Sequence, residues 1–365
     1  MRKLLLLRVG RRGGQVLLIL AITLGLDYAL TNTLFANLRQ TVSKAEAENW
    51  STYIDSPIYD HDLIANKNTE RAWGRIVYSW KTDRYGFRTG ACAGSDADKG
   101  KPAVFVIGDS FVEAMGSTFE KSFPGLIACD AAKQGKAAWN LGVASYSPAI
   151  YHLKLKAAAD KLGLTPKSIY LFLDLSDIDD DANVYQVRAD GTVGKTPVHY
   201  KPFVKGTPFD LGQFLLNNFT SIRFAYDLWL TSSFSYKESL GRDRARWTVD
   251  PDLMNKWGKR GLAIAAANLE KVVELCKQWD CQLTLIVYPW PDNVVAHDKN
   301  SIQVTYWRSW AEQFGVRFVD GFAPFFEDTA EKTLEKYYIA GDVHFTEAGN
   351  RLIFDTVKQA VGGNW

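Results

Sequence analysis

The feature that most constrains the fold of this chain is an alternation of short apolar runs and helical patterns that begins near residue 103. The apolar runs are rich in β-branched and aromatic residues, which predicts buried strands near 103–107, 138–141, 168–174, 283–288 and 316–319. Helical patterns fall near 122–135, 149–162, 262–279, 301–314 and 347–361. This order predicts an α/β domain with a mainly parallel five-stranded sheet that is covered by helices on both faces.

Length and composition allow more than this one domain. The chain has 365 residues, of which 47% are hydrophobic and 13% aromatic, enough for a large core and additional segments. The net charge of +2 gives no electrostatic reason to expect a nucleic-acid partner. We expect the α/β domain to occupy residues 101–365.

The N-terminus has the pattern of a membrane anchor. Residues 1–14 form a basic arm, and residues 15–35 are almost entirely apolar and long enough to cross a bilayer. The positive arm predicts a cytoplasmic N-terminus and a periplasmic or extracellular catalytic domain. A cleaved signal peptide is the alternative, but no small-x-small cleavage site is evident. Asp27 is costly in lipid, so we expect it near the outer interface or against a partner helix.

Two further segments flank the predicted core. Residues 36–100 are interpreted as a stalk and an ordered lead-in, in which His61 is expected to be structural. Arg88 is either a ligand for a substrate carboxylate or phosphate, or a salt-bridge partner that fixes the lead-in. Residues 182–260 form an aromatic insertion, with a helical pattern near 213–230. The insertion is either a helical hairpin stacked on the core or a lid and glycan-binding wall.

Candidate catalytic residues come from two distant segments. Gly108, Asp109 and Ser110 follow the first strand, at the sheet edge where ligands bind in open α/β folds. Asp342 lies two residues before His344, so in an extended segment both side chains point to the same side. A carboxylate in that position orients an imidazole, and the imidazole takes the proton of a serine.

These segments together resemble the SGNH (GDSL-like) hydrolase superfamily. A third match is Asn140-Leu141-Gly142, which is similar to the family's second block, and the Asp-x-His spacing is similar to the branch related to alginate-type O-acetyltransferases. The resemblance implies a three-layer flavodoxin-like fold and a catalytic triad of Ser110, His344 and Asp342. It also implies an oxyanion hole formed by the backbone N–H groups of Ser110 and Gly142.

The sequence departs from the family at the third block, which is usually Gly-x-Asn-Asp. Asp177 is closest in position, and we expect it to bind a substrate hydroxyl or to order its loop, because an ionised carboxylate cannot donate a hydrogen bond. Trp290, in a loop after the fourth strand, either borders the substrate pocket or packs against the core. His297 is a weaker candidate for the base, because no carboxylate is spaced as closely to it.

The four cysteines suggest disulfides if the domain is exported. Cys276 and Cys281 flank a turn between a helix and a strand, and Cys92 and Cys129 lie on either side of the first strand, so two bridges are plausible. Free buried thiols are the alternative. No cysteine or histidine set has the spacing of a zinc site, and no metal or other cofactor is expected.

The sequence therefore predicts a membrane-anchored serine esterase of the SGNH type. Its expected substrates are O-acyl esters, in particular acetyl esters, of envelope or exported glycans. One alternative is a polysaccharide O-acetyltransferase with the same triad, because both reactions pass through an acyl-enzyme. A second alternative is a non-catalytic carbohydrate-binding or scaffold subunit of a membrane acyltransferase complex.

Overall fold

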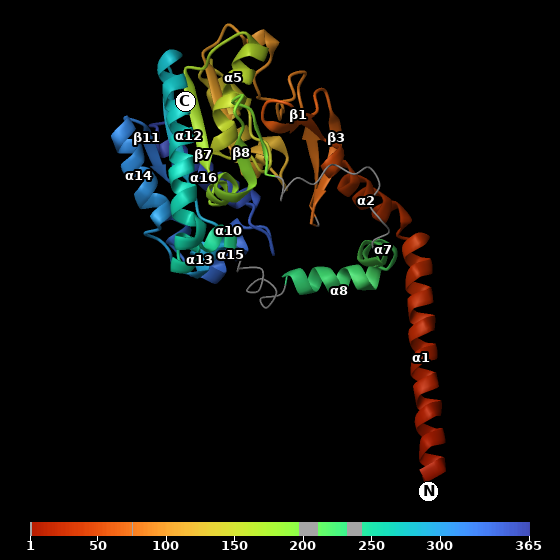
Figure 1. Ribbon diagram of the computed structural model, residues 1–365. Helices are drawn as coiled ribbons and strands as arrows, with labels where there is room; N and C mark the ends of the chain where they lie inside the picture. Colours follow the sequence, from red (N-terminus) through yellow and green to blue (C-terminus); the bar gives the residue numbers. More distant parts are fainter. Residues whose placement is uncertain (1, 75, 197–210, 232–242) are drawn as a thin grey trace.

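The central sheet has five parallel strands. In the computed structural model, which describes residues 2–74, 76–196, 211–231 and 243–365, the strand order is β6-β5-β7-β10-β11 (Figure 1). All four neighbouring pairs are parallel. Numbered in chain order the arrangement is 2-1-3-4-5, the doubly wound flavodoxin-like order. The predicted α/β class and parallel five-stranded sheet are confirmed. The strands are β5 (Ala103–Ile107), β6 (Ala137–Asn140), β7 (Ser168–Leu173), β10 (Gln282–Val287) and β11 (Arg317–Asp320).

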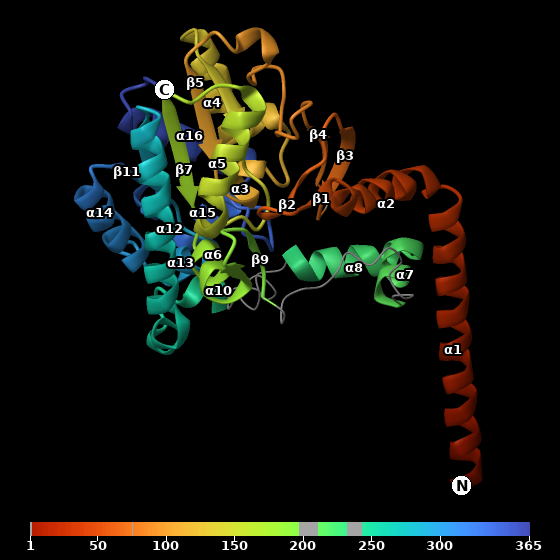
Figure 2. The same ribbon diagram turned by 45° about the horizontal axis from the view of Figure 1, so that its top comes forward.

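Helices cover both faces of this sheet. On one face α4 (Phe123–Lys133) packs against α16 (Glu347–Ala360). On the other, α5 (Pro148–Leu162), α12 (Lys259–Gln278) and α14 (Ile302–Phe314) lie over the strands (Figure 2). All five residues of β5 are buried, as a parallel strand between two helical layers requires.

The lead-in contains structure that the sequence did not predict. After α2 (Ala36–Ser51) come two antiparallel hairpins, β1 (Tyr53–Ser56) with β2 (Asp60–Leu63) and β3 (Asn68–Trp73) with β4 (Ile76–Lys81). Polar or charged residues interrupt each of these strands, so none of them forms the continuous apolar run that marks the strands of the central sheet. His61 is buried and bonded to the Ala144 carbonyl oxygen and to Asp60, in the structural role that we expected.

Shorter elements complete the described chain. They are η1 (Asp96–Asp98), α3 (Ser110–Glu113), η2 (Phe119–Lys121), α6 (Ser176–Asp179), η3 (Asp180–Val184), β8 (Tyr185–Val187), β9 (Val193–Lys195), α7 (Leu211–Asn218), α8 (Thr220–Thr231), α10 (Asp243–Arg246), α11 (Pro251–Leu253), η4 (Met254–Gly258), α13 (Pro291–Val295), η5 (Ala323–Phe326) and α15 (Ala330–Tyr337).

The aromatic insertion divides into two parts. The helix expected near 213–230 is in fact two helices, α7 and α8, which pack against α1 (Arg2–Asn32) and not on the sheet. The later part does pack on the core, because Trp247 is fully buried and donates its indole N–H to the Leu175 carbonyl oxygen at 3.1 Å. Residues 197–210 and 232–242 of the predicted lid lie outside the described residues.

Helix α1 carries the apolar segment. Residues Gly14–Asn32 have a mean hydropathy of 1.6, and only 6% of that stretch is buried against the rest of the chain. Length and composition suit a membrane span, and a signal sequence would have the same properties. The low burial distinguishes this helix from the core helix of a soluble domain.

Both suggested disulfides are present. Cys92–Cys129, the long bridge, joins the lead-in to α4 across 37 positions, and Cys276–Cys281, the short bridge, closes the turn after α12. All four cysteines are therefore bonded.

Candidate active site

Ser110 lies at the carboxyl end of β5, as the sequence predicts. It is the first residue of α3, and the side chain of Asp109 caps this helix by accepting the Phe111 N–H at 3.0 Å. Gly108 permits the tight turn, because a Cβ there would lie 2.8 Å from the Phe172 carbonyl oxygen and 2.5 Å from Val112. The chain thus turns out of the buried strand and leaves the serine partly exposed.

The structure brings Ser110, His344 and Asp342 together. His344 Nε2 lies 2.9 Å from Ser110 Oγ, and its Nδ1 lies 2.5 Å from Asp342 Oδ1. The same Asp342 oxygen accepts the backbone N–H of His344 at 2.9 Å. Asp342 therefore binds both the Nδ1 atom and the backbone of His344, and the second ring nitrogen, Nε2, is directed at the serine hydroxyl.

The electrostatics of the pair suit a general base. Burial lowers the pKa of His344, but the charge and hydrogen bond of Asp342 outweigh it and raise this pKa above its usual value of 6.5. Burial raises the pKa of Asp342, while the charge and hydrogen bonds of His344 and a hydrogen bond from Trp73 lower it to about 2. Asp342 is thus ionised at neutral pH and stabilises an imidazolium ion.

Aromatic rings enclose the imidazole. Phe111 lies 4.8 Å from the His344 ring and Trp73 meets it edge-on at 5.3 Å, between ring centroids. Trp73 ends strand β3 of the lead-in, so a segment outside the sheet completes the surroundings of the base. Sequence reasoning missed Trp73, because no motif marks it.

A buried ion pair fixes the lead-in to the helix that carries Ser110. Arg71 Nη1 lies 2.5 Å from Glu113 Oε1, and both side chains are almost fully buried. The Tyr53 hydroxyl donates to the same carboxylate at 2.9 Å, and the Ala144 N–H does so at 2.7 Å. Glu113 therefore joins β1, β3, α3 and the loop after β6, a role that its position near Ser110 in the sequence did not reveal.

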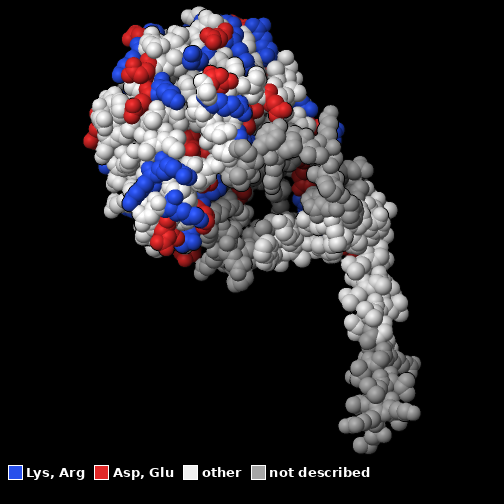
Figure 3. Space-filling model, viewed as in Figure 1, with Lys and Arg blue, Asp and Glu red and all other residues white. Residues whose placement is uncertain are grey.

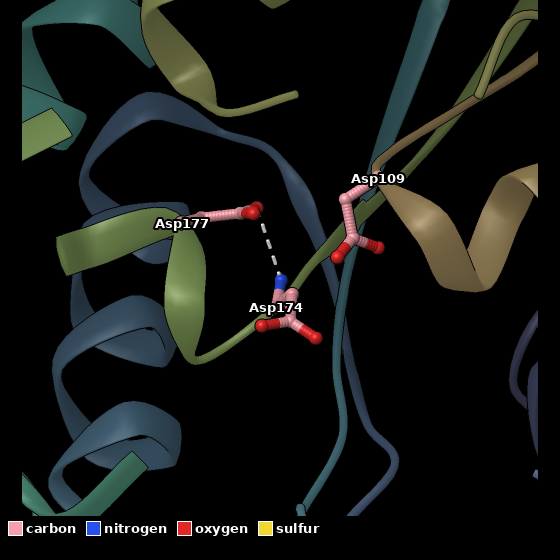
Figure 4. Close-up of side chains that lie close together, drawn as sticks. All are labelled: Asp109, Asp174 and Asp177. Carbon is pink, nitrogen blue, oxygen red and sulfur yellow. Dashed lines mark hydrogen bonds between the residues drawn. The ribbon is translucent and has the colours of Figure 1, made fainter. Parts of the chain in front are cut away.

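Three carboxyl groups gather beside the nucleophile. Atoms of Asp109, Asp174 and Asp177 lie within 4.8 Å of one another, and all three residues are buried (Figure 4). Burial, followed by the charge of Asp174, raises the pKa of Asp109 to about 8. Burial likewise raises the pKa of Asp174 and of Asp177. Sequence reasoning did not predict this cluster.

Two predicted substrate contacts belong to this buried cluster. One oxygen of Asp177 accepts the Tyr151 hydroxyl at 2.6 Å and the Asp174 N–H at 3.1 Å. Trp290 is 4% exposed and donates its indole N–H to Asp174 at 2.7 Å. The structure does not support the substrate-binding interpretation of Asp177 and Trp290, because both side chains are buried. Asp177 orders its loop, which was the alternative.

Arg88 also has a structural role. It is 1% exposed, and its guanidinium donates to the backbone carbonyl oxygens of Glu113, Ser79 and Ser117 at 3.2 Å each. Burial lowers the pKa of Arg88 to about 10. The predicted contact with a substrate anion is wrong. Arg88 does fix the lead-in, but through carbonyl oxygens.

The two N–H groups expected to form the oxyanion hole, those of Ser110 and Gly142, differ in whether another group already accepts their hydrogen bond. The Gly142 N–H already donates to Asn140 Oδ1 at 2.9 Å, so in this arrangement it does not serve an oxyanion. For the Ser110 N–H, no acceptor is found in the part of the chain that the structure describes. The prediction for Gly142 is thus corrected by the side chain of Asn140, and Ser110 keeps its N–H for a ligand.

His297, the rival base, is exposed in the turn after α13 and has positive φ. The hydroxyl of Ser110 is already bonded to His344. The geometry thus favours His344 as the base.

Comparison with known proteins gives structural similarity alone. No protein-family model matches the chain. No curated protein matches it either. Among solved structures the chain is similar to an acetylxylan esterase, a psychrotrophic esterase and a GDSL-like lipase.

Three of these structures illustrate the likeness. An acetylxylan esterase from Geobacillus stearothermophilus is 13% identical, with 75% of this chain and 98% of that chain covered and a TM-score of 0.39. The esterase EstA from Pseudoalteromonas sp. is 12% identical, with 71% and 96% covered and a TM-score of 0.39. A GDSL-like lipase from Bacteroides thetaiotaomicron is 12% identical, with 73% and 90% covered and a TM-score of 0.35. At such low values, function has to be argued from this chain's own residues.

Proposed function

We propose that this chain is a serine esterase of the SGNH type that acts through an acyl-enzyme on Ser110. The observation that carries the proposal is the continuous series of contacts from Ser110 Oγ through His344 to Asp342, with lengths of 2.9 and 2.5 Å. A hydroxyl, a base and an orienting carboxylate in this order are what nucleophilic acyl transfer requires.

In the first step, Ser110 Oγ attacks the ester carbonyl carbon while its proton moves to His344 Nε2. Asp342 stabilises the imidazolium ion that forms, and it stays ionised throughout because its pKa is about 2. The negative oxygen of the tetrahedral intermediate accepts the Ser110 N–H. One such donor is worth about 3 kcal/mol of barrier.

In the second step the intermediate collapses and the alkoxide leaves. His344 Nε2–H donates its proton to the departing oxygen, and the acyl group stays on Ser110. Water then attacks the acyl-enzyme with His344 again as base, and release of the acid restores the serine. If a sugar hydroxyl attacks in place of water, the same site performs O-acetyl transfer.

The proposed substrates are O-acyl esters, in particular acetyl esters, of envelope or exported glycans. We assign residues 1–14 to a cytoplasmic arm, residues 15–35 to an uncleaved anchor and residues 101–365 to a catalytic domain outside the membrane. Support comes from the apolar span Gly14–Asn32 and the basic residues before it. Two disulfides also suit an oxidising compartment.

Hydrolysis of p-nitrophenyl acetate by the full chain in detergent micelles tests the esterase proposal. We expect Ser110→Ala and His344→Gln each to abolish activity above the background rate. His297→Gln is the matched control, because this exposed histidine lies outside the triad, and it should retain the wild-type rate.

The other two functions are outcomes of the same experiment. Rates that equal the background for both wild type and Ser110→Ala would refute an acyl-enzyme and leave a non-catalytic scaffold. Transfer of the acetyl group to an added polysaccharide, at the expense of acetate release, would identify an O-acetyltransferase that uses the same triad.

A further inference from the structure

The N-terminus of helix α8 is hydrogen-bonded to side chains of the apolar helix α1. The backbone N–H and the hydroxyl of Ser221 both donate to Asp27 Oδ2, at 3.2 and 2.5 Å. One turn further along α1, the hydroxyls of Thr31 and Thr220 are bonded at 2.8 Å. A carboxylate at a helix N-terminus is favourable, because it accepts orphan N–H groups and complements the helix dipole. Asp27 therefore caps α8.

The direction of α8 differs from that of α1. Figures 1 and 2 both show α8 running crosswise to α1, close to the end of α1 that leads to α2. The apolar span ends at Asn32, five residues after Asp27. These five residues correspond to about 7 Å along the helix axis. If Gly14–Asn32 crosses a bilayer, α8 starts at the boundary between acyl chains and headgroups. Helices that lie in a membrane surface are buried there by about 5–10 Å.

The two sides of α8 differ in polarity. On one side the guanidinium of Arg223 pairs with Glu46 of α2 at 2.9 Å. Because each residue turns by about 100° around a helix, the opposite side carries Ala225 and Leu228, with Phe224 and Trp229 at its margins. Ser221, which is bonded to Asp27, lies on this side at the start of the helix. Phe224 is 61% exposed and Leu228 is 58% exposed.

Exposed apolar side chains are otherwise concentrated on α1. Leu17 and Leu18 are 69% and 60% exposed. Charged side chains gather on the catalytic domain, whereas the part of α1 that Figure 3 does not draw in grey and the visible side of α8 are nearly uncharged (Figure 3). The exposed apolar side chains of α8 therefore belong to a helix that contacts the anchor and is joined to it at the Asp27 cap.

We propose that α8 is a membrane-surface helix, whose Phe224, Leu228 and Trp229 side enters the outer leaflet beside α1. The inference rests on the anchoring role proposed for α1, and it is independent of the triad. The partner of this surface is the lipid bilayer. The arrangement explains why an aspartate is tolerated in the anchor, since its carboxylate is bonded to the N-terminus of α8. It also gives the protein a second attachment, which fixes the orientation of the catalytic domain above the membrane.

Spin labels on single introduced cysteines test this arrangement in the full chain. All four native cysteines are in disulfides, so an added thiol is labelled selectively. The labelled positions are Phe224→Cys in α8, Leu18→Cys in α1 and Lys133→Cys at the exposed end of α4, on the side of the domain away from α1 (Figure 2). The protein is reconstituted into phosphatidylcholine and phosphatidylglycerol vesicles. Accessibility is measured to oxygen, which partitions into lipid, and to a water-soluble nickel chelate.

The proposal predicts that the Phe224 and Leu18 labels are reached by oxygen and protected from nickel, with the reverse for Lys133. A nickel-accessible label at Phe224 with a lipid-exposed label at Leu18 would overturn the surface helix and leave the anchor intact. A Phe224 label shielded from both reagents would show that protein covers α8, and would also refute the proposal. A nickel-accessible Leu18 label would refute the proposed membrane anchor, and with it the proposal that α8 lies in the membrane surface. Ester hydrolysis in the same vesicles reports separately on the triad.

Discussion

The buried ion pair between Arg71 and Glu113 offers a sharp test of how the lead-in supports the site. Glu113→Gln keeps the shape of the side chain but removes its charge. Arg71 has no exposed side-chain surface, and the variant leaves its guanidinium buried without a counter-ion. Breaking a buried pair on one side costs about 3–5 kcal/mol of unfolding free energy. We expect a loss of that size.

Glu274→Gln is the matched control. It makes the same substitution in an ion pair with Lys277, in which both side chains are more than 60% exposed. Such a surface pair contributes about 0–1 kcal/mol. The assay is chemical denaturation of the full chain in detergent micelles, followed by tryptophan fluorescence.

A double variant separates the charge from the packing. Arg71→Met together with Glu113→Gln removes both charges, so it should recover part of the stability lost in Glu113→Gln alone. If Glu113→Gln destabilises the protein no more than Glu274→Gln, the ion pair does not hold the lead-in, and the reasoning about its burial is refuted.

Two further predictions concern the base and the disulfides. The rate of ester hydrolysis should rise with pH as His344 loses its proton, with a midpoint above 6.5 because Asp342 raises this pKa. Asp342→Asn should lower the midpoint and should lower the rate by about 10⁴-fold. An unchanged pH profile in this variant would contradict the pairing. Replacing both cysteines of the long bridge by serine should cost about 4 kcal/mol of stability, and the same change in the short bridge about 2 kcal/mol. The difference arises because the long bridge closes a longer loop. If chemical denaturation shows equal losses of stability for the two variants, each with its other bridge intact, the loop-entropy argument is contradicted.

The fold was largely predictable because its signals are local. Each strand of the central sheet is a short apolar run, and helix starts such as Ser122 and Thr346 accept the N–H groups expected of caps. The hairpins of the lead-in were missed because polar or charged residues interrupt their strands. The insertion was predicted only in part, because its aromatic content does not show that α8 packs beside Asp27 of α1 while Trp247 packs on the core.

The candidate site was predictable only in part. Ser110, Asp342 and His344 are recognised by residue type and spacing, and the structure places them in contact. Gly142 and Arg88 were misassigned because the sequence does not show that their donors are taken by Asn140 and by backbone carbonyl oxygens. The contacts of Arg88 join residues far apart in the chain, so no local pattern reveals them. The contact between Asn140 and Gly142 is local, but it depends on the orientation of the Asn140 side chain, which the sequence does not show.

The measurement that tests the central claim most directly is mass spectrometry of the full chain after incubation with an activated acetyl ester. The proposed mechanism predicts one acetyl group on the peptide that contains Ser110, with none when His344 is replaced by glutamine. An unmodified Ser110 in a protein that still hydrolyses the ester, or an acetyl group on another residue, would contradict the mechanism.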